Sequence, residues 1–204
     1  MKSIVIALTL PAWQDQIIRQ VLKEERKKEI NHELIEKAKN ACIKTQDEKF
    51  MFAFAFYTYN TQNRIEIVEE LLKIDPSKWA IPCATEITSN LTYSPIIDAN
   101  LCIDALIKAG DCETLVKFAK RIGHNHKIEN YLIERKEADL LLEYAEKIKG
   151  ANIAKIKNFI EAYSQTSTFG NAYKFKMERI YQKKIKNSKN LQQSMEIMGE
   201  ENQK

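Results

Sequence analysis

Two histidines and one cysteine are the residues whose types and spacing come nearest to a metal site. His124 and His126 follow Gly123 closely, and Cys112 precedes them in the chain. Imidazole nitrogen and thiolate sulfur are zinc ligands, and zinc takes four ligands in a tetrahedral arrangement. An H-x-H pair supplies only two and has no second spaced pair. We therefore interpret both histidines as solvent-exposed residues at a helix start, and the sequence predicts no metal site.

Groups suited to acid–base or nucleophilic catalysis are also scattered. Glu69 and Glu70 are adjacent, so on a helix they point to different sides and cannot share a proton-transfer site. No serine or cysteine is visibly matched with a histidine and a carboxylate. Neither a G-x-G-x-x-G nor a G-K-[ST] phosphate loop is present. The sequence predicts a protein that is not an enzyme and binds no cofactor; a small α-helical enzyme with an unrecognised site is an alternative.

A basic cluster around Gly123 is the candidate surface for binding a partner protein. Arginine is enriched at the energetically dominant positions of protein interfaces and lysine much less so. Arg121 is therefore the strongest candidate contact, and the alternative is that the whole cluster is only a solvated surface. The cluster residues lie off the apolar stripes of their helices: Lys117, Lys120, Arg121, His126 and Lys127.

A second basic stretch covers residues 174–189, which hold seven basic residues and a single acidic one, Glu178. This stretch predicts, at most, peripheral contact with acidic lipid headgroups, or contact with an acidic partner. A soluble basic helix without such a role is the alternative. The net charge of the whole chain, +4, is too small to indicate nucleic-acid binding, and we expect none.

Short amphipathic helices between residues 94 and 149 must position the cluster around Gly123. Ser94-Pro95 is typical of a helix start, with proline at the first helical position. Gly110-Asp111 closes one helix and caps the next, and Gly123 and Gly150 suit the left-handed residue that follows a helix. Apolar residues recur at helical spacing between these breaks, so the stretch predicts a stack of helices.

These helices also resemble one another in sequence. The set Leu115, Phe118, Ala119, Ile122 and Gly123 recurs as Leu141, Tyr144, Ala145, Ile148 and Gly150, and Lys127-Ile128 recurs as Lys155-Ile156. A repeated helical unit buries its apolar stripe only by stacking on its neighbours. The predicted fold is therefore all-α, an α-solenoid of stacked short helical hairpins. Chance convergence of two amphipathic helices is the alternative.

The rest of the chain divides into four predicted regions. Residues 1–10 form a packed or extended N-terminal segment that is too short to span a bilayer. Residues 11–168 form the helical-repeat domain, and residues 169–186 form a basic C-terminal helix. Residues 187–204 are polar and are predicted to be a disordered tail.

Residues Phe50–Phe56 are the hardest part of the repeat domain to assign. Phenylalanines alternate with smaller residues, a period of two that suits a strand. Both faces are nonetheless apolar, the flanks are helical, and Asp47 is a good N-cap, so we favour a helix buried on nearly all sides.

Four cysteines are scattered through the chain, without a C-x-x-C pair. A small secreted protein would carry a denser disulfide framework, so we expect reduced thiols in the cytosol. We also expect Cys112 to be partly exposed, because it lies in the first turn of its helix. The other three lie within helical patterns and are expected to pack as small apolar residues: Cys42, Cys83 and Cys102.

A set of capping and packing residues between positions 94 and 159 forms a pattern that spans about a third of the chain. These residues are Ser94-Pro95-Ile96, Phe118-Ala119-Lys120-Arg121-Ile122-Gly123, Lys127-Ile128, Leu132-Ile133, Ala138 and Ala145. With this pattern, residues 94–159 resemble the C-terminal helical domain of the vacuolar protein sorting-associated protein 16 family. At Arg135-Lys136 that family often has Gly-Asp.

The resemblance implies a protein–protein interaction scaffold in vesicle-mediated transport. Such a protein would be a subunit of a HOPS- or CORVET-like membrane-tethering complex that binds a Sec/Munc-type SNARE regulator. It would act in the cytoplasm and peripherally on endosomal or vacuolar membranes. The alternative is a helical-repeat structural subunit of another large multiprotein assembly.

Overall fold

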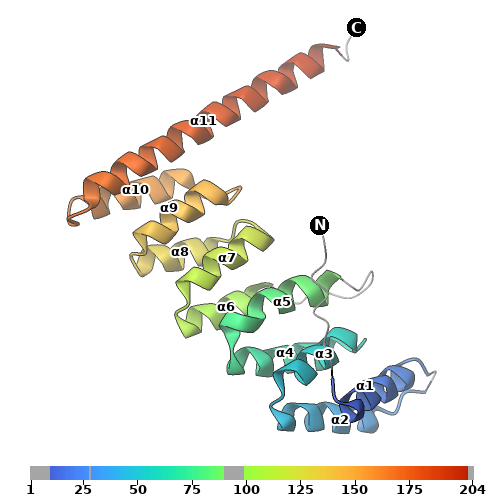
Figure 1. The fold of residues 1–204 in the computed structure, drawn as a ribbon. Coiled ribbons are helices and arrows are strands. Elements are labelled where there is room, and N and C mark those ends of the chain that lie inside the picture. The colour runs from blue at the N-terminus through green and yellow to red at the C-terminus, as the bar shows by residue number, and fades with distance from the viewer. Residues whose placement is uncertain (1–9, 28, 90–98, 202–204) are drawn as a thin grey trace. The chain divides into compact units, whose positions relative to one another are not determined.

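The computed structural model describes residues 10–27, 29–89 and 99–201, and the side chains of 86–89 and 188–201 lie outside this description. The described residues form eleven α-helices and no strand (Figure 1). The prediction of an all-α fold is therefore confirmed. The helices are α1 (Ala12–Glu25), α2 (His32–Thr45), α3 (Glu48–Tyr57), α4 (Thr61–Ile74), α5 (Pro76–Ser89), α6 (Ala99–Ala109), α7 (Cys112–Ile122), α8 (His126–Glu134), α9 (Ala138–Lys147), α10 (Ile153–Ser164) and α11 (Gly170–Glu201).

The helices belong to two compact units, Met1–Thr114 and Leu115–Lys204. The boundary between the units falls within the first turn of α7, and the repeat domain expected for residues 11–168 stays a prediction. Two predicted features lie outside the described residues: most of the N-terminal segment 1–10, and the Ser94-Pro95 helix start.

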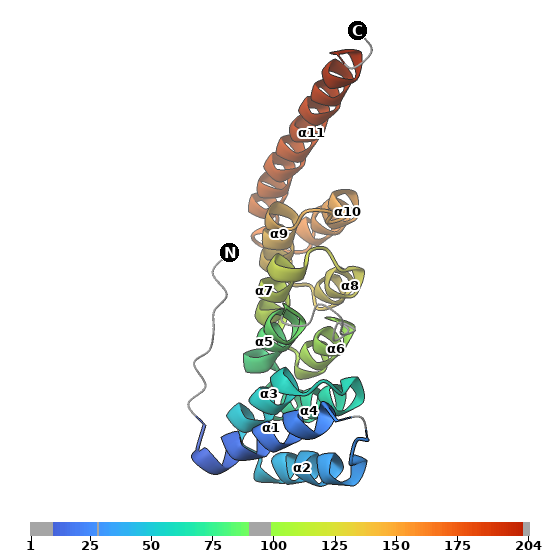
Figure 2. The same ribbon diagram turned by 90° about the vertical axis from the view of Figure 1, so that its right-hand side faces the viewer.

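In the first unit each helix packs on the next helix and on the next but one. The odd-numbered helices α1, α3 and α5 contact in order along the chain, and so do the even-numbered helices α2, α4 and α6. Figure 2 shows α3 and α5 in one layer of the unit and α4 and α6 in the other. This is the packing expected of stacked helical hairpins.

In the second unit α9 is the central helix and packs on α8, α10 and α11. The Lys120 side chain of α7 forms an ion pair with Glu143 of α9. Equivalent residues of the two sequence copies are completely buried on α7 and α9: Leu115 and Leu141, Phe118 and Tyr144, Ala119 and Ala145. The two copies therefore bury the same stripe, as the repeat predicts.

The phenylalanine-rich stretch forms α3 and is helical, as predicted. The Asp47 carboxylate caps this helix and accepts hydrogen bonds from the backbone N–H groups of Lys49 and Phe50. Every residue from Phe50 to Ala55 is buried. Because neighbouring helices cover α3 on all sides, its residues show no amphipathic period, and this explains the strand-like alternation.

Two prolines lie in α5. The helix begins at Pro76 and runs to Ser89, and Pro82 lies inside it. The Asp75 carboxylate caps its start by accepting from Lys78 N–H at 3.0 Å.

A buried arginine closes the C-terminal end of α3. The Arg64 side chain is 1% exposed, and its guanidinium donates to the carbonyl oxygens of Ala55, at 3.1 Å, and of Thr58. The Glu25 carboxylate accepts from the Thr58 hydroxyl and from the backbone N–H of Tyr59 and Asn60. Together these groups satisfy the backbone where α3 ends and α4 begins.

The last helix, α11, is longer than the predicted one. It begins at Gly170 and continues to Glu201, through residues 187–201 where the sequence predicts a disordered tail. Its first turn approaches the end of α10 closely. A Cβ added to Gly170 would lie 1.9 Å from the Ser164 carbonyl oxygen, so only glycine fits there.

None of the four cysteines forms a disulfide, and all four are buried. Cys112 is 8% exposed, so the expectation of partial exposure was wrong. The Cys112 side chain is covered by the surrounding structure although it lies in the first turn of α7. None of the helices in the described part of the chain combines the length and hydropathy that a membrane span needs.

Candidate functional site

The turn between α7 and α8 carries the predicted partner-binding cluster. Gly123 ends α7 with a φ of +95°, in the left-handed region, and its N–H donates to Ala119 O at 2.8 Å. The Asn125 side chain then caps α8 by accepting from Lys127 N–H at 2.9 Å. The left-handed conformation predicted for Gly123 is confirmed, and it allows the chain to reverse within a few residues.

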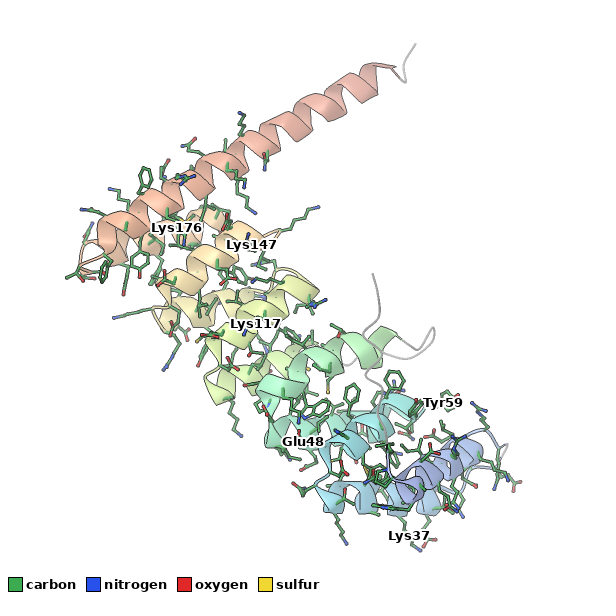
Figure 3. The ribbon with its side chains drawn as sticks, viewed as in Figure 1. Lys37, Glu48, Tyr59, Lys117, Lys147 and Lys176 are labelled. Atoms are coloured by element: carbon green, nitrogen blue, oxygen red, sulfur yellow. The ribbon has the colours of Figure 1, made fainter. Side chains whose placement is uncertain are left out.

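The five cluster residues flank this turn on both sides. Lys117, Lys120 and Arg121 are exposed on α7, and Figure 3 labels Lys117 on that helix. His126 is the exposed first residue of α8, and Lys127 is half-buried beside it.

The cluster residues differ in the electrostatic contacts that they make within the molecule. Lys120 already pairs with Glu143, so part of its charge is neutralised within the molecule. Lys120 and Arg121 also lie in the last turn of α7, where cations interact favourably with the negative end of the helix dipole. Exposure and charge therefore leave Arg121 as the strongest candidate contact, although a purely structural role in the helix end is compatible with the same position.

A buried tyrosine holds the turn in place, a role that helical periodicity does not reveal. The Tyr144 hydroxyl accepts from Asn125 N–H at 3.0 Å and donates to Asn125 O at 3.1 Å. It also lies 3.0 Å from His124 Nδ1. Burial raises the pKa of Tyr144 to about 12, so the hydroxyl stays protonated and the anchor is intact at neutral pH.

A buried carboxylate links this turn to the next one. Glu129 is 2% exposed and accepts from Asn152 N–H at 3.0 Å. Its oxygens lie 3.7 Å from Lys155 Nζ and 3.8 Å from His124 Nδ1. Asn152 caps α10 as Asn125 caps α8, so Glu129 connects equivalent positions of the two copies.

Gly150 brings the two turns into direct contact. Its φ is +88°, as the predicted left-handed position requires, and a Cβ placed on it would lie 3.3 Å from His124 Cβ. The Gly123 turn is therefore held in place by the hydrogen bonds of Tyr144 and by its contact with the Gly150 turn. Arg121 and His126 are presented on its outer edge.

The buried polar groups at the turn hold the backbone of neighbouring segments together. The polar groups at the turn, Tyr144 and Glu129, are buried and engaged with backbone N–H groups. In the described ranges no group of three or more His, Cys, Asp or Glu side chains is placed to hold a metal ion.

A second exposed surface lies on α11, where sequence reasoning found only a charge excess. A groove of about 560 Å³ runs along this helix and beside Glu146 of α9. Figure 3 labels Lys176 on this helix. The groove is lined by Glu146, Phe175, Lys176, Glu178, Arg179, Ile180, Gln182 and Lys183.

Comparisons with known proteins identify no relative of this chain. No family model matches it, and neither the curated proteins nor the solved structures include a match. Any function must therefore be argued from the chain's own residues and from the resemblance of residues 94–159.

Proposed function

We propose that this chain is a protein–protein interaction scaffold built from stacked helical hairpins. The observation that carries the proposal is the order of packing. In the first unit each helix contacts its neighbour and next neighbour along the chain, and in the second unit α9 packs on α8, α10 and α11. In such a stack one side of each helix packs against neighbouring helices, and the turns and outer helix surfaces stay available to partners. The Gly123 turn is one such surface, held rigid by buried hydrogen bonds.

We propose further that the assembly is a HOPS- or CORVET-like tethering complex on endosomal or vacuolar membranes. The support is the resemblance to the vacuolar protein sorting-associated protein 16 family. Four of the residues that carry it, Phe118, Ala119, Ala138 and Ala145, are buried packing residues. They support a shared helical architecture directly and a shared partner only through the family.

Rigidity at the Gly123 turn supports binding there because a preformed surface loses little conformational freedom when a partner binds. Arg121 can pair with a carboxylate through two parallel hydrogen bonds, which gives directional recognition of an acidic partner surface. Lys127 adds positive charge on the α8 side of the turn, and His126 adds a hydrogen-bonding imidazole. We propose that these residues contact the Sec/Munc-type protein.

The test is co-precipitation of a purified Sec/Munc-type protein with the wild-type chain and with the double variant Arg121→Glu/Lys127→Glu. Charge reversal is expected to weaken binding by about 1–3 kcal/mol without unfolding the protein. The matched control is Lys44→Glu/Lys49→Glu, which changes the net charge equally at exposed positions of the first unit. Melting temperature and circular dichroism verify that both variants are folded.

Each result separates the proposals. If the wild-type chain recovers no Sec/Munc-type protein, the tethering assignment is wrong. Mass spectrometry of what co-purifies with the native chain then tests the alternative, a structural subunit of another large assembly. Equal recovery by wild type and by the Arg121/Lys127 variant would remove the Gly123 turn as the contact surface.

A further inference from the structure

The two sides of α11 have different roles. Met177 and Ile180 are 1% and 7% exposed, on the side where α11 packs against α9 and α10. The other side projects away from these contacts, and helical spacing brings its residues together on one face. Its exposed residues are Phe175, Lys176, Arg179, Lys183 and Lys186, and we call them the basic face of α11.

The positive charge of this face is not neutralised within the described residues. Glu178 lies to its side and accepts from Gln182 at 2.8 Å and from Lys157 of α10 at 2.7 Å, and these contacts lower its pKa. In the described part of the chain no acidic side chain forms an ion pair with Lys176, Arg179 or Lys183. A negatively charged ligand would therefore find unoccupied cations there.

The basic face also has an apolar component and a concave shape. Phe175 is 69% exposed, which is unusual for so large an apolar side chain. It lies with Ile180 in the groove of about 560 Å³, where Glu146 of α9 contributes to the wall. A groove that combines cations, an exposed aromatic ring and a wall is suited to a ligand that has both acidic and apolar side chains.

We propose that the basic face of α11 binds an acidic segment of a partner protein. Carboxylates of the segment pair with Lys176, Arg179 and Lys183, and Arg179 can hold one carboxylate by two parallel hydrogen bonds. One apolar side chain of the segment packs on Phe175 and toward Ile180. Glu146 repels acidic residues at its side of the groove, so it favours a neutral or basic residue there and gives the segment a direction.

A membrane surface fits this face less well. A helix that lies in a bilayer interface inserts a broad apolar face. Among the side chains of α11 that the structure describes, Met177 and Ile180 are buried against α9 and α10, and Phe175 is the large apolar residue left exposed. A single-stranded nucleic acid would need several aromatic rings among the cations to stack its bases, and the groove has one.

The test measures binding of a short fluorescent peptide of aspartate and glutamate with one central leucine to the whole chain, by fluorescence anisotropy. Arg179→Glu/Lys183→Glu is expected to weaken binding by about tenfold or more, and raised salt is expected to weaken binding to the wild type. Lys44→Glu/Lys49→Glu in the first unit is the charge-matched control and is expected to bind as wild type does. Circular dichroism and melting temperature confirm that the variants are folded.

A double comparison isolates the apolar contact. Phe175→Ala is expected to weaken binding of the leucine peptide by several-fold but to leave binding of the same peptide with serine in place of leucine nearly unchanged. Equal effects on both peptides would overturn the proposed contact between the apolar side chain and Phe175.

Vesicles containing phosphatidylserine and a single-stranded oligonucleotide are the competing probes. Binding of either one that is tighter than peptide binding, and lost in Arg179→Glu/Lys183→Glu, would overturn the proposal in favour of a membrane or nucleic-acid surface. Peptide binding that is absent, or that the charge reversal does not change, would also overturn it. The assay involves no tethering partner, so its failure leaves the proposal for the Gly123 turn untouched.

Discussion

At the scale of single residues, the carboxylate of Asp47 connects α1 and α3. It caps α3 through the N–H groups of Lys49 and Phe50, and it accepts from the Gln14 side chain of α1 at 2.8 Å. The Gln14 hydrogen bond, followed by the two backbone hydrogen bonds, holds the pKa of Asp47 below its ordinary value of 3.8. The carboxylate is therefore more stable as an anion in the folded protein than in the unfolded one.

The lowered pKa predicts a dependence of stability on pH. A carboxyl whose pKa is lower in the folded state stabilises the fold above its ordinary pKa, and this contribution is lost as the pH falls through the lowered value. We expect the free energy of unfolding of Asp47→Asn to fall less steeply than that of wild type as the pH drops below about 4. Urea denaturation across that range measures this, and parallel curves for the two proteins would contradict it.

Arg64 provides a second prediction, because its charge is buried against backbone carbonyls. Desolvation lowers its pKa, with a smaller opposing effect from Glu25. Arg64→Met keeps much of the side-chain volume but leaves the carbonyls of Ala55 and Thr58 without their donor. We expect a loss of about 2–4 kcal/mol in the free energy of unfolding. Urea denaturation is the measurement.

Arg19 supplies the control for the Arg64 variant. It pairs with Asp15 at 2.6 Å on the surface, where its side chain is 76% exposed. Arg19→Met should change the free energy of unfolding by less than about 1 kcal/mol, because exposed ion pairs contribute little. Equal losses for the two variants would show that the buried hydrogen bonds of Arg64 are not important for stability.

Caps were easier to predict from the sequence than buried polar contacts. Asp47, Gly123 and Gly150 were identified because capping depends on residue type and on the few residues around it. Arg64 and Tyr144 were not, since periodicity shows which face of a helix is buried but not which distant backbone group its polar atom meets. The same limit applies to the Arg121 cluster: its exposure and its place at one turn were predictable, whereas the ion pair of Lys120 with Glu143 was not.

At the scale of single helices, the contacts between helices explain which sequence patterns were misleading. The alternating residues of α3 suit a strand when read alone, and the helical flanks were what favoured a helix correctly. The extension of α11 was missed because residues 187–201 are polar and have little apolar area to bury. Their helical backbone continues from a packed first half, and the sequence does not show where that half is anchored.

Gly170 gives the prediction that belongs to this scale. In Gly170→Ala the new methyl group would overlap the Ser164 carbonyl, so α11 must shift away from the end of α10. Overpacking of this kind costs about 1–3 kcal/mol, and we expect reduced helicity and a lower melting temperature. Phe159 and Tyr163, whose rings stack at 5.8 Å on α10, report a change in this packing by near-ultraviolet circular dichroism.

Ala172→Gly is the converse control for the Gly170 variant. Ala172 is exposed two residues later in α11, so its replacement tests helix propensity without altering the contact with Ser164. We expect a cost of about 1 kcal/mol from propensity alone. If Gly170→Ala were as stable as wild type, the close approach of the two helices would not exist in solution.

At the scale of the whole molecule, the helices belong to two compact units with a boundary near Thr114. That boundary depends on which helices pack on one another, and the spacing of residues in the sequence carries no such information. All-α content, by contrast, followed directly from the helical periodicity and the shortage of glycine and proline.

The nearest-neighbour packing described for each unit has a consequence for how the chain acquires its structure. Helices with substantial contact in the described residues are at most two places apart along the chain, so each contact closes only a short loop. Low contact order of this kind is associated with folding in microseconds to milliseconds. A hairpin that has left the ribosome already holds most of the residues it will touch. The chain can therefore begin to assemble during synthesis, before its C-terminal helices exist.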